Sequence, residues 1–221
     1  MIRGILFDMD GLMFDTEAIG YRGWKEAGRR LGIRIDDEAI AALRGLGDRE
    51  KREMFGRMTG RPEEYEKALA VRVDYADQWI SENGLPVKPG LKELLCFLKA
   101  EKIPAALATS TERKKAMSYL RMADVEKYFT ASVCGKEAGN SKPAPDIFLK
   151  AAEKLEIPPE ECLVLEDSVN GLKAAKAAGC MAAVVPDLTP APPEEDGLWD
   201  WKVSDLGEMI PIIRKTRISE K

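Results

Sequence analysis

The chain of 221 residues contains no histidine. This absence excludes Ser-His-Asp and Cys-His catalysis, and it excludes the histidine-rich sites that usually hold zinc. Acid–base and metal chemistry must then depend on carboxylates, lysine, hydroxyls and backbone groups. Because oxygen ligands suit hard cations, Mg²⁺ is the natural metal for such a chain.

Cysteine is also scarce. The four cysteines stand far apart, without a Cys-x-x-Cys pair: Cys96, Cys134, Cys162 and Cys180. This spacing is typical of free thiols in a reducing compartment rather than of a disulfide framework or a zinc site. We therefore expect buried free cysteines and a cytoplasmic protein.

Long apolar runs and blocks of one charge are missing too. No run approaches the roughly 18 residues that span a bilayer, and the apolar N-terminal run stops at Asp8, too early for a secretory signal. Acidic and basic residues nearly balance, 38 against 34, which gives a formal net charge of −4. Because neither sign dominates a long stretch, we expect neither a membrane nor a nucleic-acid partner.

Short apolar runs alternate with helical patterns over most of the chain. Four runs precede polar loops: residues 2–8, 103–108, 162–165 and 181–185. Between them, apolar residues recur at helical spacing, as in Ile147, Ala151 and Leu155. Strands that alternate with helices predict βαβ units. The predicted fold is α/β, with a Rossmann-like, doubly wound parallel sheet that is covered by helices on both faces.

Residues 16–85 interrupt this alternation, because they contain helical patterns and no strand-like run. The longest helix is predicted over residues 63–83, where Gly84 and a nearby proline form an ordinary stop signal. We therefore predict two domains. Residues 1–15 and 86–221 form an α/β core, and the intervening segment forms an inserted all-helical cap domain.

Acidic and hydroxyl side chains stand where the predicted strands end. Asp8 and Asp10 end the first run. Residues 109–111 (Thr-Ser-Thr) follow the second, and residues 166–168 (Glu-Asp-Ser) follow the third. Because ligands bind outside the carboxyl ends of parallel strands, these groups are expected to converge at one edge of the sheet. So many carboxylates together are unfavourable unless a cation neutralises them.

Each of these groups also has an ordinary structural interpretation. An aspartate after a strand commonly caps a helix or forms a turn. The hydroxyls at 109–111 stand where they would cap a helix that begins at Glu112, and residues 166–168 precede a helix that stops at Gly179. Capping does not exclude function, because a helix N-terminus is itself an anion site. Taken alone, Lys142 is most simply a solvated lysine.

Four short motifs occur in a set order along the chain: Asp8-Met9-Asp10-Gly11, Ala108-Thr109-Ser110, Ser141-Lys142-Pro143 and Leu165-Glu166-Asp167-Ser168. In this order they resemble the motifs of the haloacid dehalogenase-like hydrolase superfamily. Two longer features are similar to the branch that contains β-phosphoglucomutase and small sugar-phosphate phosphatases with a helical cap: residues 7–11 together with Asp15-Thr16 and Trp24, and residues 142–146. The resemblance extends over essentially the whole chain.

The resemblance implies a phosphatase that works through an aspartyl-phosphate. Asp8 would be the nucleophile, and Asp10 would protonate the leaving alcohol and then activate the attacking water. Thr109 would donate a hydrogen bond to a phosphate oxygen. Lys142 would neutralise the nucleophile and the charge that develops during transfer.

The resemblance also implies a Mg²⁺ cofactor and a small phosphorylated metabolite as partner. We expect the enzyme to be a monomer. The Asp8 carboxylate, the Asp10 carbonyl and Asp167 would hold the ion, with Glu166 in an outer shell or bound through water. The cap would close over the site, exclude water and recognise the leaving group. The implied substrate contacts are Gly11, Thr16, Gly20, Trp24, Arg44, Arg49, Thr109, Ser110 and Lys142.

Two positions of the cap depart from the mutase pattern. The resemblance to β-phosphoglucomutase would place a histidine near position 20, where this chain has Gly20, and Asp48 stands where an arginine is expected in the loop at residues 44–49. Because plain hydrolysis needs less of the cap, a phosphatase is the leading hypothesis. A sugar-phosphate mutase and a non-catalytic phospho-ligand binding module are the alternatives. Haloalkanoic-acid dehalogenases normally lack the second aspartate of the first motif, so Asp10 argues against dehalogenation. Phosphonate hydrolysis would need a cap lysine that forms a Schiff base, and no cap lysine lies in a motif for it.

Overall fold

The structure, a computed structural model, describes residues 1–44 and 46–218. The chain divides into two compact units. Unit 1 comprises Met1–Phe14 and Val87–Lys221, and unit 2 comprises Asp15–Pro86. These limits lie next to the boundaries expected from the sequence, whereas the assignment of unit 2 as a cap stays a prediction.

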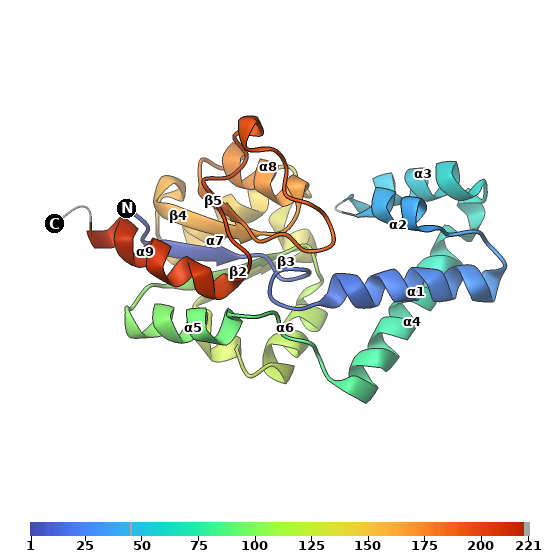
Figure 1. The fold of residues 1–221 in the computed structure, drawn as a ribbon, viewed down its shortest axis with the longest axis horizontal. Coiled ribbons are helices and arrows are strands. Elements are labelled where there is room, and N and C mark those ends of the chain that lie inside the picture. Colours follow the sequence, from blue (N-terminus) through green and yellow to red (C-terminus); the bar gives the residue numbers. More distant parts are fainter. Residues whose placement is uncertain (45, 219–221) are drawn as a thin grey trace. The chain divides into compact units, whose positions relative to one another are not determined.

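A parallel sheet forms the centre of unit 1 (Figure 1). Its strands, within the described residues, are β1 (Gly4–Phe7), β2 (Ala105–Thr109), β3 (Ala131–Cys134), β4 (Cys162–Glu166), β5 (Met181–Val184) and β6 (Trp201–Lys202). The strand order is β3-β2-β1-β4-β5-β6, and every pairing is parallel. The chain builds the sheet outward from β1 and then, in the other direction, from β4. This arrangement confirms the predicted doubly wound α/β fold and places its switch point between β1 and β4.

Helices cover both faces of this sheet. They are α5 (Leu91–Ala100), α6 (Arg113–Met122), α7 (Asp146–Leu155), α8 (Val169–Ala177) and α9 (Met209–Ile218). Leu6 and Val164 belong to one buried cluster with residues of α7 and α8. Ile5 and Phe7 are also fully buried. Because alternate residues of a strand point to opposite faces, these two side chains face the other side, where Figure 1 shows α5, α6 and α9.

Unit 2 is helical throughout its described residues. Its elements are α1 (Thr16–Leu31), α2 (Asp37–Leu43), α3 (Asp48–Thr59), the 3₁₀ helix η1 (Pro62–Glu64) and α4 (Tyr65–Asn83). Trp24, Phe55 and Tyr65 form its aromatic centre, with ring centroids 5.5–6.3 Å apart. The helix predicted from residue 63 therefore starts as a 3₁₀ turn, and it ends before Gly84 as expected, with φ at 82°. Gly45, in the cap loop singled out from the sequence, lies outside the described residues.

The sequence patterns do not predict β3 and β6. Only Val133 and Cys134 of β3 are buried, and the strand contains Ser132, so it lacks a continuous apolar run. β6 has two residues and pairs only with β5 in the described sheet. Strands this short and this polar carry little periodicity, so the pairing partner rather than the local sequence defines them.

Cysteine exposure departs from the expectation at one position. All four thiols are free, and burial raises the pKa of Cys162 and of Cys180 to about 12, so both stay protonated. Cys96 is exposed, contrary to the prediction of buried thiols. It lies on α5 with its Sγ 3.3 Å from the hydroxyl oxygen of Tyr128, on a position that does not face the sheet.

No helix in the described ranges combines the length and the apolar character needed to cross a bilayer. The cytoplasmic location and the monomeric state stay predictions.

Candidate active site

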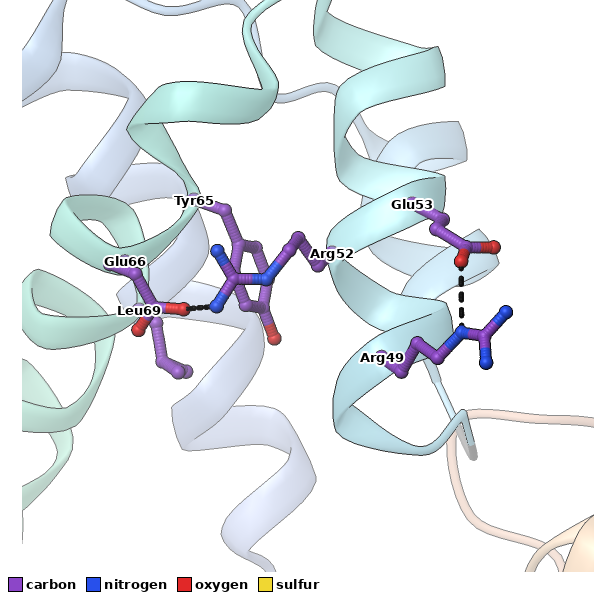
Figure 2. A pocket seen from close by; sticks show the side chains of 6 residues that line it. All are labelled: Arg49, Arg52, Glu53, Tyr65, Glu66 and Leu69. Carbon is purple, nitrogen blue, oxygen red and sulfur yellow. Dashed lines mark hydrogen bonds and ion pairs between the residues drawn. The ribbon is translucent and has the colours of Figure 1, made fainter.

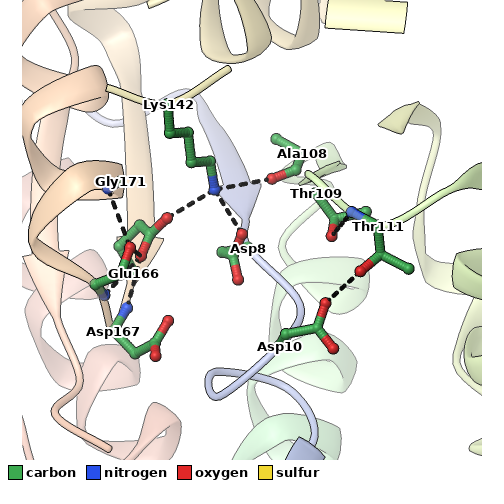
Figure 3. Close-up of polar contacts among 10 residues, drawn as sticks. Asp8, Asp10, Ala108, Thr109, Thr111, Lys142, Glu166, Asp167 and Gly171 are labelled. Carbon is green, nitrogen blue, oxygen red and sulfur yellow. Dashed lines mark hydrogen bonds and ion pairs between the residues drawn. The ribbon is translucent and has the colours of Figure 1, made fainter. Parts of the chain in front are cut away.

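Buried polar side chains meet at the carboxyl ends of three neighbouring strands (Figure 3). Asp8 directly follows β1, Thr109 ends β2 and Glu166 ends β4. All three are buried, and Glu166 is 0% exposed. Burying charged groups is costly unless they are paired and hydrogen-bonded, so their partners determine what this edge of the sheet can do.

Lys142 joins two of these carboxylates. Its Nζ lies 2.5 Å from Oδ1 of Asp8 and 2.7 Å from Oε1 of Glu166, and it also donates to the carbonyl oxygen of Ala108 at 3.4 Å. The lysine side chain is only 9% exposed. Taken alone, the sequence suggests a solvated lysine here. The structure instead brings the ammonium group to the candidate nucleophile.

One ammonium group shared between two buried carboxylates explains the pKa shifts. Burial raises the pKa of Asp8 to about 7, since the Lys142 charge lowers it by less and the Glu166 charge raises it again. Burial also acts to lower the pKa of Lys142, but the Asp8 and Glu166 carboxylates outweigh it and raise that pKa above its ordinary value. Lys142 therefore stays charged, while Asp8 lacks full compensation. A further cation beside Asp8 would favour its ionised form.

Both carboxylate oxygens of Glu166 are engaged by the protein. Oε1 accepts from Lys142, and Oε2 accepts from the backbone N–H of Asp167 at 2.9 Å, the backbone N–H of Ser168 at 2.8 Å and the Ser168 hydroxyl at 2.9 Å. The Ser168 oxygen also accepts from the N–H of Gly171 at 3.0 Å, which confirms that this segment caps α8. With both oxygens already used, Glu166 is suited to an outer shell around a cation rather than to direct ligation.

Gly171 makes room for Glu166, and this contact leads to a stability prediction. A Cβ at position 171 would lie 1.6 Å from Oε1 of Glu166 and 1.9 Å from its Cδ. Gly171→Ala would gain about 1 kcal/mol of helix propensity, but it would force Glu166 away from Lys142. We expect the free energy of unfolding to fall by about 2–4 kcal/mol, because a buried ion pair is broken. Urea unfolding of the variant measures this loss.

Lys173→Ala is the matched control for that experiment, because Lys173 is exposed on the same helix. Its free energy of unfolding should stay within about 0.5 kcal/mol of the unchanged protein. If Gly171→Ala were as stable as this control, Glu166 would not need the space beside Gly171.

Gly11 makes a similar space for Asp167. A Cβ at Gly11 would lie 2.3 Å from Oδ2 of Asp167, and the φ of Gly11 is +84°, a region that favours glycine. Gly11 is predicted to contact substrate, and the structure shows a second reason for glycine at this position. The Asp167 carboxylate rests directly against the turn that follows the candidate nucleophile.

The carboxylates fit a divalent cation. Oxygen atoms of Asp8, Glu166 and Asp167 all lie within 4.8 Å of one another. The set contains neither imidazole nor thiol. Its negative charge exceeds the positive charge of Lys142, whose ammonium group bonds to two of its members. Oxygen ligands of this kind suit hard cations. Asp10 is predicted to contribute its backbone carbonyl, so its side chain remains available for proton transfer.

Thr111 orients Asp10. The Thr111 hydroxyl donates to Oδ2 of Asp10 at 2.6 Å, and the Thr111 N–H donates to Oγ1 of Thr109 at 3.1 Å. The expectation that the hydroxyls at 109–111 cap the next helix is wrong. α6 begins at Arg113, and its N-cap residue Glu112 makes no capping hydrogen bond through its side chain. The Thr111 hydroxyl contacts Asp10 instead, the Thr109 hydroxyl oxygen accepts from Thr111, and Ser110 is exposed.

The remaining predicted substrate residues belong to unit 2. Thr16 is the first residue of α1, and Arg44 is the C-cap residue of α2. Gly20 is buried under α4, where a Cβ would lie 2.4 Å from Nη2 of Arg72. The Arg72 guanidinium also lies 5.7 Å from the ring centroid of the buried Trp24. Arg72 therefore fills the space beside Gly20, and nothing in the motifs indicates this arginine.

Arg49 lines a pocket of about 410 Å³ within unit 2. Its lining residues, which Figure 2 shows, are Arg49, Arg52, Glu53, Tyr65, Glu66 and Leu69. Arg49 pairs with Glu53 at 3.1 Å, and Arg52 pairs with Glu66. The Arg49 side chain is 91% exposed. Because a carboxylate accompanies each guanidinium, the pocket presents no surplus of positive charge, and a substrate contact by Arg49 stays a prediction.

Comparisons with known proteins identify the family of the chain. The sequence profile of the haloacid dehalogenase-like hydrolases matches residues 2–179. A Thermotoga maritima protein named phosphorylated carbohydrates phosphatase is 33% identical over 178 residues, which cover 80% of this chain and 82% of that protein. The β-phosphoglucomutase of Bacillus subtilis is 32% identical over 190 residues, which cover 83% of each chain.

A solved structure shares the fold over nearly its whole length. CbbY from Rhodobacter sphaeroides, in complex with phosphate, is 29% identical and has a TM-score of 0.79, covering 95% of this chain and 96% of that chain. The profile match and both relatives extend over most of the chain, and the profile match includes the four motifs around Asp8, Thr109, Lys142 and Glu166. The chain therefore belongs to the haloacid dehalogenase-like hydrolase family, in the branch of β-phosphoglucomutase and the sugar-phosphate phosphatases.

Proposed function

We propose that the chain is a Mg²⁺-dependent phosphatase that hydrolyses a small phosphomonoester, most simply a phosphorylated carbohydrate, through an aspartyl-phosphate on Asp8. The observation that carries this proposal is the buried Lys142, bonded to both Asp8 and Glu166 at 2.5 and 2.7 Å. Family membership and the phosphatase and mutase names of the relatives support the reaction and the class of substrate.

In the first half of the proposed reaction, an oxygen of Asp8 attacks phosphorus and the bond to the leaving oxygen breaks. Lys142 balances the charge of Asp8 and of the phosphoryl oxygens, because its ammonium group stays charged and buried at this position. Thr109 accepts from a backbone N–H through Oγ1, which leaves its own hydrogen available for a phosphoryl oxygen. Asp10 gives a proton to the leaving oxygen.

In the second half, water attacks the phosphorus of the aspartyl-phosphate and Asp8 leaves as a carboxylate. Asp10, now ionised, takes the proton of that water, and inorganic phosphate is released. Thr111 holds Asp10 in place for both proton transfers through the 2.6 Å hydrogen bond. A Mg²⁺ ion held by Asp8, Asp167 and the Asp10 carbonyl would supply electrostatic stabilisation of the transferred phosphoryl group.

The mutase alternative differs in the fate of the phosphoryl group after the first transfer. A mutase must return this group from Asp8 to a second hydroxyl of the sugar, whereas a phosphatase transfers it to water. In this chain the space beside Gly20, where the mutase resemblance would place a histidine, holds the Arg72 guanidinium. This difference favours hydrolysis. We further propose that unit 2 acts as the cap that recognises the leaving group.

Phosphate release from a panel of phosphomonoesters tests the proposal. The panel contains hexose and pentose phosphates, hexitol phosphates, nucleotides and phospho-acids. We expect the highest kcat/KM for a phosphorylated carbohydrate, with stoichiometric release of inorganic phosphate. Conversion of one sugar phosphate into its positional isomer without phosphate release would identify a mutase. Turnover of no ester in the presence of Mg²⁺ would overturn the enzymatic proposal.

Metal removal gives a direct prediction. Because the site offers carboxylate oxygens and one ammonium group, activity should fall to background after dialysis against a chelator and return when Mg²⁺ is added. Zn²⁺, which favours nitrogen and sulfur ligands, should restore much less. Full activity in metal-free buffer, verified by elemental analysis, would contradict the proposed mechanism.

A further inference from the structure

A second lysine–aspartate pair lies at the carboxyl end of β5. Asp187 follows this strand, and its Oδ1 lies 2.7 Å from Nζ of Lys88. The two residues are 99 positions apart in the sequence, and neither belongs to the motifs around Asp8. The pair therefore requires an explanation of its own.

The second carboxylate oxygen of Asp187 has no hydrogen-bond partner among the described residues. Oδ2 is fully enclosed, and the Asp187 side chain as a whole is only 7% exposed. A buried acceptor that stays unused costs free energy, so such an atom usually has a partner. A bound water molecule, ligand or hydrated ion can supply the donor for this oxygen.

The unused oxygen lies close to Gly11, the glycine that the Asp167 carboxylate also contacts. The position that a Cβ of Gly11 would occupy lies 3.3 Å from Oδ2 of Asp187 and 2.3 Å from Oδ2 of Asp167. The two carboxylates thus lie against the same glycine, within the unit that also contains Asp8. Lys88 already balances the charge of Asp187, so its Oδ2 lacks a hydrogen-bond donor rather than a counter-charge.

Lys88 contacts both Asp187 and the turn that contains Gly11. The backbone N–H of Lys88 donates to the carbonyl oxygen of Met13 at 2.9 Å, and the N–H of Gly11 donates to the carbonyl oxygen of Phe14 at 3.0 Å. The ion pair uses Oδ1 and leaves Oδ2 directed at Gly11. The side chain is therefore held in place before any ligand binds, as an outer-shell group must be to orient a metal site.

We propose that Asp187 is a positioning residue of the metal site, whose free oxygen accepts a hydrogen bond from a water molecule in the hydration shell of the bound Mg²⁺. This inference rests on the proposed function, because it assumes the ion beside Asp8 and Asp167. Mg²⁺ keeps several of its waters when it binds to proteins, and each of them is a strong donor that needs an acceptor. Asp187 supplies one acceptor without touching the ion.

Calorimetric titration of the metal-free protein with Mg²⁺ tests the inference. Asp187→Asn keeps the shape, and its amide oxygen still accepts from Lys88, but an NH₂ donor replaces the free oxygen. We expect the Kd for Mg²⁺ to rise about tenfold or more. The Mg²⁺-dependent increase of Tm should shrink at the same Mg²⁺ concentration, since ligand stabilisation follows affinity.

Asp200→Asn is the matched control, because Asp200 also pairs with a lysine of unit 1, Lys176, at 2.6 Å but lies outside the metal cluster. Its Kd for Mg²⁺ should equal that of the unchanged protein. If Asp187→Asn lowered Tm in metal-free buffer but bound Mg²⁺ with unchanged affinity, the role of Asp187 would be structural and the inference would be overturned. If the unchanged protein bound no Mg²⁺, both this inference and the proposed Mg²⁺-dependent function would be overturned.

Discussion

Asp8→Asn is expected to abolish the phosphoenzyme and to lower kcat by a factor on the order of 10⁴–10⁶, the range found when single members of a catalytic triad are removed. The substitution keeps the shape of the side chain but replaces the attacking oxygen by a neutral amide. It also removes one of the carboxylates that we propose as ligands of the cation. Acid quenching during turnover, followed by mass spectrometry of the intact protein, reports whether a phosphoryl group is attached.

The buried ion pairs predict that the Asp8→Asn protein still folds. Lys142 keeps Glu166 as its partner at 2.7 Å, so no buried charge is left unpaired. The variant should therefore unfold cooperatively, which separates lost chemistry from lost structure. Asp124→Asn is the matched control, since Asp124 is an exposed aspartate that pairs with Lys127 at 2.6 Å and lies outside the metal cluster. A phosphoenzyme in the Asp8→Asn protein would show that another residue is the nucleophile.

The carboxylates of this site could be located from the sequence because topology constrains them. Parallel strands align their carboxyl ends, so acids that follow separate apolar runs must share one edge of the sheet. Asp8, Asp10 and Glu166 follow from this rule alone. Lys142 does not, because it follows no predicted strand. Only its place in the ordered motifs suggested a role.

The partners that orient these groups could not be predicted in the same way. Thr111 and Asp10 are 101 residues apart, and the sequence does not indicate which of three consecutive polar residues turns toward the aspartate. Residue propensity favours capping at these positions, but the tertiary contact with Asp10 determines where the Thr111 hydroxyl points. Side-chain direction at the end of a strand depends on the neighbouring strand, which a local pattern does not contain.

Gly171 did leave a signal that could have been used. A glycine near the start of a helix costs about 1 kcal/mol relative to alanine, so its presence in α8 suggests that something fills the space of a side chain. The structure shows that the Glu166 carboxylate fills it. The Lys88–Asp187 pair left no comparable signal, because an isolated lysine or aspartate is most often a solvated surface residue.

Asp10→Asn should separate proton transfer from nucleophilic attack. The amide oxygen of asparagine can still accept from Thr111 at the position of Oδ2, so the side chain should keep its place, and the backbone carbonyl is unchanged. Metal binding should therefore largely survive. The lost proton transfer should lower kcat for a sugar phosphate by about 10²–10⁴-fold. Thr111→Val is the companion variant, because it keeps the Asp10 carboxylate and removes the hydroxyl that donates to it. We expect it to lower kcat by less than Asp10→Asn does.

The chemistry of the leaving group makes this prediction specific. The alkoxide of a sugar is a poor leaving group and needs a proton, for which we propose Asp10 as the donor, whereas the phenolate of p-nitrophenyl phosphate departs without one. Asp10→Asn should therefore slow the sugar phosphate much more than the aryl phosphate in the phosphorylation step, measured by single-turnover kinetics. Equal slowing of both substrates, with chemistry rate-limiting, would mean that Asp10 acts through charge or position. Because a fold hosts many chemistries and only the site carries the function, that outcome would revise the role of Asp10 without affecting the assignment of the family.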